Sequence, residues 1–190
     1  MIKTFVFNEL KLKGAYIIEP FVADDERGLF IKDYSKEIFE KNGIDHTLYE
    51  TFYTISYKGT IRAIHFQEIS HQPKLVRCIS GRIFDVIVDL RPNSATFGKW
   101  LGFYLSGENK KEILVPPHFG HGYLVLEDSI VSYKCAAAFD GKYDSGIKYN
   151  DKDIGIDWPF DEIGGEKNII ISKKDLQLQS FKEYVLRKCP

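Results

Sequence analysis

Short apolar runs, separated by glycine, proline and other turn-forming residues, dominate the pattern of hydrophobic and polar positions along the chain. The stretch 83–90 (IFDVIVDL) predicts a strand with two different faces. Its apolar face carries Phe84, Val86, Val88 and Leu90, and its mixed face carries Asp85, Ile87 and Asp89. Many short strands at such spacing are typical of an antiparallel sandwich or barrel. The predicted strands cover residues 14–20, 48–56, 60–67, 74–79, 83–90, 100–105, 112–115, 122–126 and 130–135.

Two helices are predicted beside these strands. The first begins after Ser35 as its N-cap and ends near Gly43. The second closes the chain, where Ser172 and Asp175 form a Ser-x-x-Asp signal for a helix start that leads into LQLQSFKEYVLRK.

A turn near Glu127 and Asp128 is expected to separate the last two predicted strands. A three-residue loop there pairs Tyr123 with Tyr133, and alternation places His121 on the face of both tyrosines. The three side chains are therefore expected to gather over one face of the sheet.

The composition narrows the class of partner. The chain has 190 residues, which fits one domain spanning residues 1–190. Its 14 Phe and 11 Tyr suit sheets better than helical bundles. The formal net charge of -1 creates no field that attracts nucleic acid or an anionic membrane. No apolar run approaches the ~20 residues of a membrane span, so neither nucleic acid nor membrane is expected as a partner.

The cysteines and the N-terminal residues indicate the cellular compartment of the protein. Cys78, Cys135 and Cys189 have no metal-ligand spacing, and the N-terminal residues lack the apolar core of a signal peptide. We therefore expect reduced thiols in a cytoplasmic protein.

Candidate chemistry centres on two histidine motifs. Gly59, followed after five residues by His65, resembles the first motif of the cupin proteins. Metal-binding cupins have a second ligand two residues further on, where this chain has Gln67, and the second motif, PPHFGHGY, supplies His121. Two histidines and a neutral amide make a poor site for a divalent metal. The pattern predicts a cupin pocket without metal, in which His65 is free to act as a base.

Seven segments carry a more specific resemblance through their joint order and spacing. They are residues 26–30 (ERGLF), 61–67 (IRAIHFQ), 73–100, 116–128 (PPHFGHGYLVLED), 131–135 (VSYKC), 149–159 (YNDKDIGIDWP) and 171–175 (ISKKD). On these segments the chain resembles the dTDP-4-dehydrorhamnose 3,5-epimerases. The resemblance implies an all-β jelly-roll cupin fold and a homodimer. It also implies cofactor-independent epimerisation of a nucleoside-diphosphate 4-keto-6-deoxy sugar at C3, C5 or both, in the synthesis of surface polysaccharide sugars.

The resemblance assigns four residues to the chemistry. His65 is the base that removes a proton beside the C4 ketone, because its reference pKa of ~6.5 lies near working pH. Asp175 orients the imidazole and stabilises its cation, although an Asp at this position also stabilises a helix start by itself. Lys74 stabilises the developing oxyanion, and Tyr133 returns a proton from the opposite face.

A second set of residues is implied in binding the nucleotide-sugar substrate. Arg27 and Arg62 are expected to hold the diphosphate, because guanidinium groups match phosphate oxygens. The segment with Arg27 is implied to reach across from the neighbouring subunit. Arg62 and His65 are three residues apart, so both can face a pocket only if the strand bends or bulges between them. The other residues implied near the substrate are Phe30, Lys32, Glu50, Phe52, Gln67 and His121.

Several positions near the substrate depart from the family pattern. Lys32 replaces a carboxylate, Phe52 replaces an amide, and Ala138 and Phe139 stand where the family commonly has tyrosines. The nucleobase is therefore left open between thymine and another base, including that of a guanine-linked heptose. Three alternatives on the same scaffold are a C3-only epimerase, a sugar-nucleotide ketoisomerase and a non-catalytic sugar-binding cupin. A metal-dependent oxygenase is disfavoured by Gln67.

Overall fold

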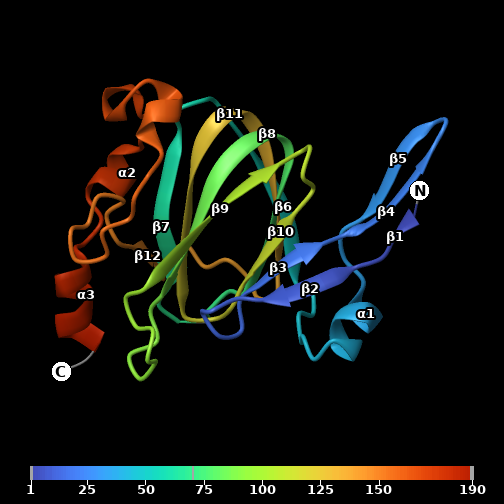
Figure 1. Cartoon of the computed structure of the whole chain (residues 1–190). Coiled ribbons are helices and arrows are strands. Elements are labelled where there is room, and N and C mark those ends of the chain that lie inside the picture. The colour runs from blue at the N-terminus through green and yellow to red at the C-terminus, as the bar shows by residue number, and fades with distance from the viewer. Residues whose placement is uncertain (1, 70, 189–190) are drawn as a thin grey trace.

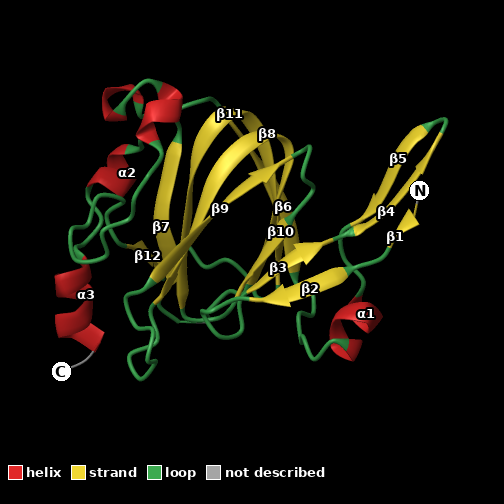
Figure 2. Ribbon diagram, viewed as in Figure 1, coloured by secondary structure: helices red, strands yellow, loops and turns green. Residues whose placement is uncertain are grey.

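The computed structural model describes residues 2–69 and 71–188 (Figure 1, Figure 2), so Cys189 lies outside the described residues. Its strands are β1 (Ile2–Lys3), β2 (Val6–Glu9), β3 (Tyr16–Glu19), β4 (Phe21–Asp25), β5 (Gly28–Lys32), β6 (Glu50–Ser56), β7 (Ile61–Gln67), β8 (Lys74–Asp89), β9 (Trp100–Ser106), β10 (Glu112–Val115), β11 (Phe119–Cys135) and β12 (Asp144–Gly146). Its helices are α1 (Lys36–Lys41), α2 (Lys173–Leu176) and α3 (Phe181–Lys188), with 3-10 turns at Phe160–Ile163 and Glu166–Asn168. The all-β class with short peripheral helices is thus confirmed.

Two long strands organise the larger sheet. β8 and β11 pair antiparallel along most of their length and arch across the molecule, as Figure 1 shows. The strand order is β12-β7-β11-β8-β10-β3-β2, with β6 added on β11 and β9 on β8. Because β7 and β6 pair with different halves of β11, this one strand contributes to two walls of the barrel.

The turn predicted near Glu127 and Asp128 is wrong, because the chain bends there without reversing. β11 continues through both residues, and its register against β8 shifts on either side of Glu127. Bulges of this kind bend a strand while pairing continues. Opposite the bend, Gly81 has a φ of 77° and lies too close to the carbonyl oxygen of Asp128 for a side chain to fit. The four short strands predicted here are therefore two long ones, and Tyr123 and Tyr133 are not paired with each other.

Both faces of the second half of β8, residues 83–89, are buried, which changes the meaning of its alternation. The face with Phe84 and Val86 packs in a core cluster with Trp158 of the C-terminal segment. The opposite face carries Ile87, which belongs to a second core cluster, and Asp85, which has no exposed surface. The predicted mixed face is therefore an interior face that brings a carboxylate into the barrel.

The start points of both predicted helices are confirmed. Ser35 is the N-cap of α1, which ends at Lys41, just before Gly43. Ser172 is the N-cap of α2, and its hydroxyl accepts a hydrogen bond from the backbone N–H of Asp175 at 3.0 Å. Within the described residues, no helix has the length and apolar character needed to cross a membrane.

The prediction of one continuous closing helix is wrong, because tertiary contacts interrupt it between α2 and α3. Leu178 is buried in this interval, and the carbonyl oxygen of Gln179 accepts the backbone N–H of Lys148. Ser180 then caps α3, and its backbone N–H donates to the Glu183 carboxylate at 2.6 Å. This Ser-x-x-Glu capping box is a signal in the sequence that marks a second helix start.

A small separate sheet projects from the body at the right of Figure 1. β1, β4 and β5 form it, and β4 and β5 make a hairpin with Glu26 and Arg27 at its turn. We call this hairpin, residues 21–32, the arm. Its strands were missing from the prediction, although two five-residue runs around a two-residue turn that precedes Gly28 are a hairpin signal.

Candidate active site

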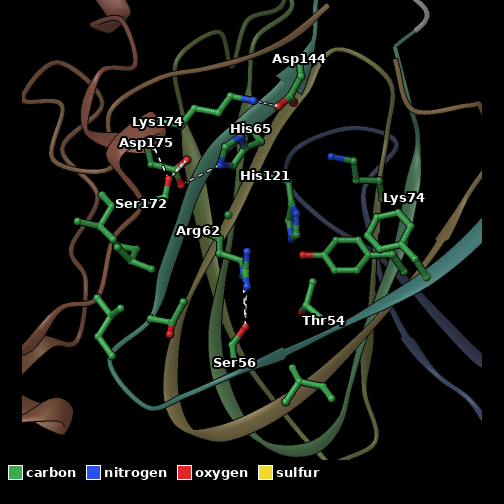
Figure 3. Close-up of a pocket in the computed structure, with 18 of the residues that line it drawn as sticks. Thr54, Ser56, Arg62, His65, Lys74, His121, Asp144, Ser172, Lys174 and Asp175 are labelled. Carbon is green, nitrogen blue, oxygen red and sulfur yellow. Dashed lines mark hydrogen bonds and ion pairs between the residues drawn. The ribbon is translucent and has the colours of Figure 1, made fainter. Parts of the chain in front are cut away.

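A pocket of about 680 Å³ opens between the barrel strands and α2, and Figure 3 shows many of the residues that line it. Seven of the residues predicted for the site line this pocket: Phe52, Arg62, His65, Lys74, His121, Tyr133 and Asp175. Other lining residues include Thr54, Ser56, Gln72, Phe139, Asp144, Ser172 and Lys174. The side chains come from β6, β7, β8, β11, β12 and α2, so the complete fold is needed to assemble the site.

His65 and Asp175 face each other at one wall of the pocket (Figure 3). Nε2 of His65 lies 3.0 Å from Oδ2 of Asp175, and the two side chains are 24% and 8% exposed. The Ser172 hydroxyl donates to the other carboxylate oxygen at 2.9 Å. Burial raises the pKa of Asp175, but hydrogen bonds from His65 and Ser172 outweigh burial and lower the pKa. Asp175 is therefore an anion at neutral pH, and it can orient the imidazole and stabilise its cation.

Arg62 and His65 both face the pocket because β7 bulges between them. His65 pairs with His121 of β11, whereas Arg62 pairs with Tyr123, so two residues of β7 lie opposite Gly122 alone. A side chain at Gly122 would collide with the backbone of β7, which requires glycine at this point. The bulge expected from the three-residue spacing is thus confirmed.

Lys74 lies across the cavity from His65, as Figure 3 shows, and Tyr133 also lines the pocket. Lys74 begins β8, and Tyr133 lies on the half of β11 that pairs with β6. Burial lowers the pKa of Lys74, and nearby groups that include Asp85 partly oppose this shift. Burial raises the pKa of Tyr133 well above its usual range, and Tyr123 and Asp85 add to the effect. The phenol is therefore protonated at neutral pH and available as a proton donor.

A second histidine–aspartate pair begins at the pocket wall, where His121 lines the cavity, and ends at Asp85, which is fully buried and does not line it. Nε2 of His121 is 2.9 Å from Oδ2 of Asp85, and the side chains are 3% and 0% exposed. Burial raises the pKa of Asp85, an effect that His121 partly opposes. The His121 ring meets Tyr133 edge-on, with centroids 5.8 Å apart. Sequence reasoning missed Asp85, although the alternation along β8 was the signal that could have found it.

Phe52 and Glu50 are two residues apart on β6 but have different surroundings. The Phe52 ring stacks on Tyr133 with centroids 4.7 Å apart and an interplanar angle of 13°. Glu50 Oε1 accepts from Gln72 Nε2, just before β8, at 2.8 Å and from the backbone N–H of Phe139, in the loop after β11, at 2.9 Å. Glu50 therefore fastens the loop that carries Phe139 beside the pocket, while Phe52 itself lines the pocket.

Gln67, which stands where a metal-binding cupin has a ligand, is buried and does not line the pocket. Its side-chain oxygen accepts the backbone N–H of Asp140 at 3.3 Å. Its Nε2 has no hydrogen-bond partner among the described residues. Across the same residues, no group of three or more His, Cys, Asp and Glu side chains is placed to hold a metal ion.

Arg27, Phe30 and Lys32 lie on the arm, outside the pocket of their own chain. The Arg27 guanidinium pairs with Asp25 at 2.6 Å, and its side chain is 85% exposed. Phe30 is 60% exposed, and the ammonium of Lys32 lies 5.8 Å from the centre of the Phe21 ring. The arm thus presents a cation and an aromatic ring to the surroundings of the molecule.

Comparison with known proteins relates the whole chain to one group. A family model described as dTDP-4-dehydrorhamnose 3,5-epimerase matches residues 9–183. A curated relative of that name from Methanothermobacter thermautotrophicus is 46% identical over 94% of this chain and 96% of its own length. Another from Escherichia coli is 38% identical over 94% of this chain and 95% of its own length. The solved structure of dTDP-6-deoxy-D-glucose-3,5-epimerase from Legionella pneumophila, in complex with dTDP-4-keto-L-rhamnose, has a TM-score of 0.88 at 33% identity and covers 94% of each chain. The chain therefore belongs to the dTDP-4-dehydrorhamnose 3,5-epimerase family, as an isomerase with the jelly-roll cupin fold.

Proposed function

We propose that the chain inverts both C3 and C5 of a dTDP-linked 4-keto-6-deoxyhexose, and so converts the keto-glucose form into the keto-rhamnose form without a metal or other cofactor. One observation carries the proposal: a single pocket holds a histidine–carboxylate pair and, on another strand, a buried protonated phenol. The nucleotide sugar bound by the Legionella pneumophila relative has the chemistry that such a pocket would act on.

The ketone at C4 acidifies the hydrogens on C3 and C5, so inversion needs a base, a cation for the enolate oxygen and an acid on the other face. His65 takes the proton, the C–H electron pair becomes part of the enolate, and Asp175 stabilises the imidazolium. Lys74 stabilises the enolate oxygen, a contribution often worth ~3 kcal/mol per donor. Tyr133 then gives its proton to the same carbon from the opposite face. Proton exchange with solvent returns both His65 and Tyr133 to their starting states.

We assign the diphosphate to Arg62 together with the arm of a second copy of the chain. The Arg62 guanidinium donates to the Ser56 hydroxyl at 3.2 Å, and the side chain remains accessible from the pocket. Arg27 and Phe30 offer a cation and an aromatic ring, groups that suit a phosphate and a nucleobase. Lys32, further along the arm, would lie near the nucleotide.

A homodimer follows from this assignment, and the surface beside the pocket supports it. Tyr53, Ile55 and Tyr57, on β6 and just after it, are 67%, 67% and 71% exposed. Apolar side chains gathered along one strand are typical of a surface that another protein covers. We propose that a second copy covers this surface and that its arm completes the pocket.

We place the reaction in the cytoplasm. Cys78 and Cys135 are buried free thiols, and burial raises the pKa of each to about 11. Protonated thiols that form no disulfide fit a reducing compartment.

The test is incubation with a panel of 4-keto sugars on different nucleoside diphosphates in deuterated water, followed by NMR. We expect deuterium at both C3 and C5 of the dTDP-linked 4-keto-6-deoxyhexose, and accumulation of the rhamno product. Deuterium at C3 alone would contradict the double inversion. Turnover of a guanine-linked heptose in preference to the dTDP sugar would contradict the substrate, and binding without exchange would favour a sugar-binding protein.

A further inference from the structure

The arm ends in a partly buried cluster of charged side chains. Asp33, the residue directly after β5, accepts hydrogen bonds from Lys134 Nζ at 2.7 Å and Arg77 Nη1 at 3.2 Å. The side chains of Asp33, Lys134 and Arg77 are 23%, 14% and 7% exposed, so salt screens these pairs less than surface pairs. One carboxylate therefore joins the foot of the arm to both β8 and β11.

Asp33 is the anion that balances the two cations. Burial raises its pKa, but Lys134 and Arg77 outweigh burial and lower it. Glu112 lies opposite Arg77 on β10 and is completely buried, and neither of its carboxyl oxygens has a hydrogen-bond partner among the described residues. Burial raises the pKa of Glu112 well above its usual range, which keeps this second carboxyl neutral.

The cluster lies on the outer side of the strand that carries Tyr133. Lys134 follows Tyr133 directly on β11, and successive strand residues point to opposite faces. Tyr34, next to Asp33, donates to the backbone oxygen of His46, and His46 Nε2 donates to the backbone oxygen of Lys134 at 2.9 Å. Two independent sets of contacts therefore fasten the foot of the arm to β11.

We propose that Asp33 is a positioning residue that sets the direction of the arm, and that it acts on the active site of the partner subunit rather than on its own. The inference rests on the proposed function, in which the arm of one subunit completes the pocket of the other. Without the carboxylate, two cations with little exposed surface lose their anion. The foot of the arm then loses its link to β8 and keeps only the Tyr34–His46 contacts to β11. The catalytic side chains of the same subunit keep their own contacts.

The first test is the Asp33→Asn homodimer. We expect KM for the nucleotide sugar to rise about tenfold with kcat nearly unchanged, the pattern of lost uniform binding. Asp33→Glu, which keeps the charge, should recover most of the affinity. Glu37→Gln is the matched control, because it removes an exposed carboxylate that pairs with Lys41 on the adjacent α1, and it should leave KM unchanged.

The second test separates an effect on the partner from damage to the variant's own pocket. Co-expression with two affinity tags yields a hybrid dimer of one Asp33→Asn subunit and one His65→Asn subunit. The His65→Asn subunit lends an intact arm to the only pocket that retains His65. The hybrid should therefore have the wild-type KM and about half the wild-type kcat per dimer, one working site of two.

A parallel hybrid of Arg27→Ala with His65→Asn tests the proposed function itself. If this hybrid regains the wild-type KM while the Asp33→Asn hybrid does not, Asp33 acts within its own subunit and the inference is overturned. If the Arg27→Ala hybrid also fails, the arm does not complete the partner's pocket, and the proposed function loses its dimeric site. An Asp33→Asn homodimer with the wild-type KM would overturn the inference directly.

Discussion

His65 and His121 both line the pocket, and each pairs with an aspartate at nearly the same distance but in different surroundings. His65 and Asp175 are 3.0 Å apart and retain 24% and 8% exposure, whereas His121 and Asp85 are 2.9 Å apart and retain 3% and 0%. Hydrogen bonds lower the pKa of Asp175 despite its burial, while burial raises the pKa of Asp85. The same two residue types thus give an accessible pair with an ionised carboxylate and an enclosed pair with a carboxyl that resists ionisation.

The difference comes from the neighbours of each carboxylate. Ser172 donates to one oxygen of Asp175 while His65 contacts the other. Oδ1 of Asp85 has no hydrogen-bond partner among the described residues. A carboxylate with several donors is stabilised as an anion, and one with a single partner in a buried site is not. We therefore place proton abstraction at His65 and give His121 and Asp85 the role of shaping the pocket around Tyr133.

The largest expected effect is that of His65→Asn. Turnover should fall at least ~100-fold, the usual scale for loss of a general base, while calorimetry still detects binding of the nucleotide sugar. His118→Asn is a suitable control, because His118 lies outside the pocket and its φ of 64° is tolerated by asparagine. A His65→Asn enzyme that remains active, or one that no longer binds, would remove His65 from the role of base.

A smaller and more selective effect is expected for Tyr133→Phe. Inversion should slow on the order of 100-fold, because the acid on the opposite face is lost. Deuterium should still enter the substrate carbon with retained configuration, since His65 and Lys74 are untouched. Equal loss of exchange and inversion, with fold and binding intact, would show that Tyr133 is more than the opposite-face acid. No change in either would assign that step to Tyr123 or to water.

The two aspartates should respond to pH with opposite sign. Asp175 has a folded-state pKa below its unfolded value, so its stabilisation is present above ~3.9 and is lost as pH falls through the folded pKa. Asp85 has a raised folded-state pKa, so its contribution is present at acid pH and is lost as pH rises through that pKa. At neutral pH, Asp175→Asn should lower the unfolding free energy by about 1.5–3 kcal/mol, the usual contribution of a hydrogen bond to a charged group. Asp85→Asn should lower it less or raise it.

Thermal unfolding of both variants at neutral and acid pH measures this contrast. The difference in unfolding free energy between wild type and Asp175→Asn should shrink as the pH falls toward the folded-state pKa of Asp175. If Asp85→Asn were the more destabilised variant at neutral pH, the ionised carboxylate would belong to the buried pair.

Chelation is expected to have the smallest effect. Gln67 stands at the position of a metal ligand, and a neutral amide with two histidines holds a divalent ion poorly. Activity after exhaustive dialysis against a chelator should equal that of the untreated enzyme, with elemental analysis of both samples. Stoichiometric zinc or iron whose removal abolishes turnover would contradict this expectation.

The sequence predicted the parts of this molecule that short-range patterns specify. Alternation and turn residues located most strands of the barrel, and the motif around His65 led to residues that the structure gathers in one pocket. The bend at Glu127 was mistaken for a turn, because a bulge and a hairpin loop contain similar residues and differ only in what the partner strand does. The interruption before α3 depends on burial of Leu178, a tertiary contact that helix periodicity does not contain.

Hydrogen-bond partners that lie far apart in the chain could not be predicted from local sequence patterns. Asp175 was found only through the family resemblance, and Asp33 was missed because its partners lie far away in the chain. The sequence around Arg27 indicates the family motif, whereas the hairpin that carries it is defined by the pairing of β4 with β5. The homodimer that we propose would explain the exposure of this arm in a single chain.

The central claim is that the His65–Asp175 pair, and not the His121–Asp85 pair, removes the substrate proton. The most direct test measures by NMR the entry of deuterium into C3 and C5 of the dTDP-linked 4-keto-6-deoxyhexose, with His65→Asn and His121→Asn compared side by side. The account predicts that His65→Asn loses exchange by at least ~100-fold, while His121→Asn keeps it within about tenfold of wild type. Normal exchange in His65→Asn together with lost exchange in His121→Asn would contradict the account.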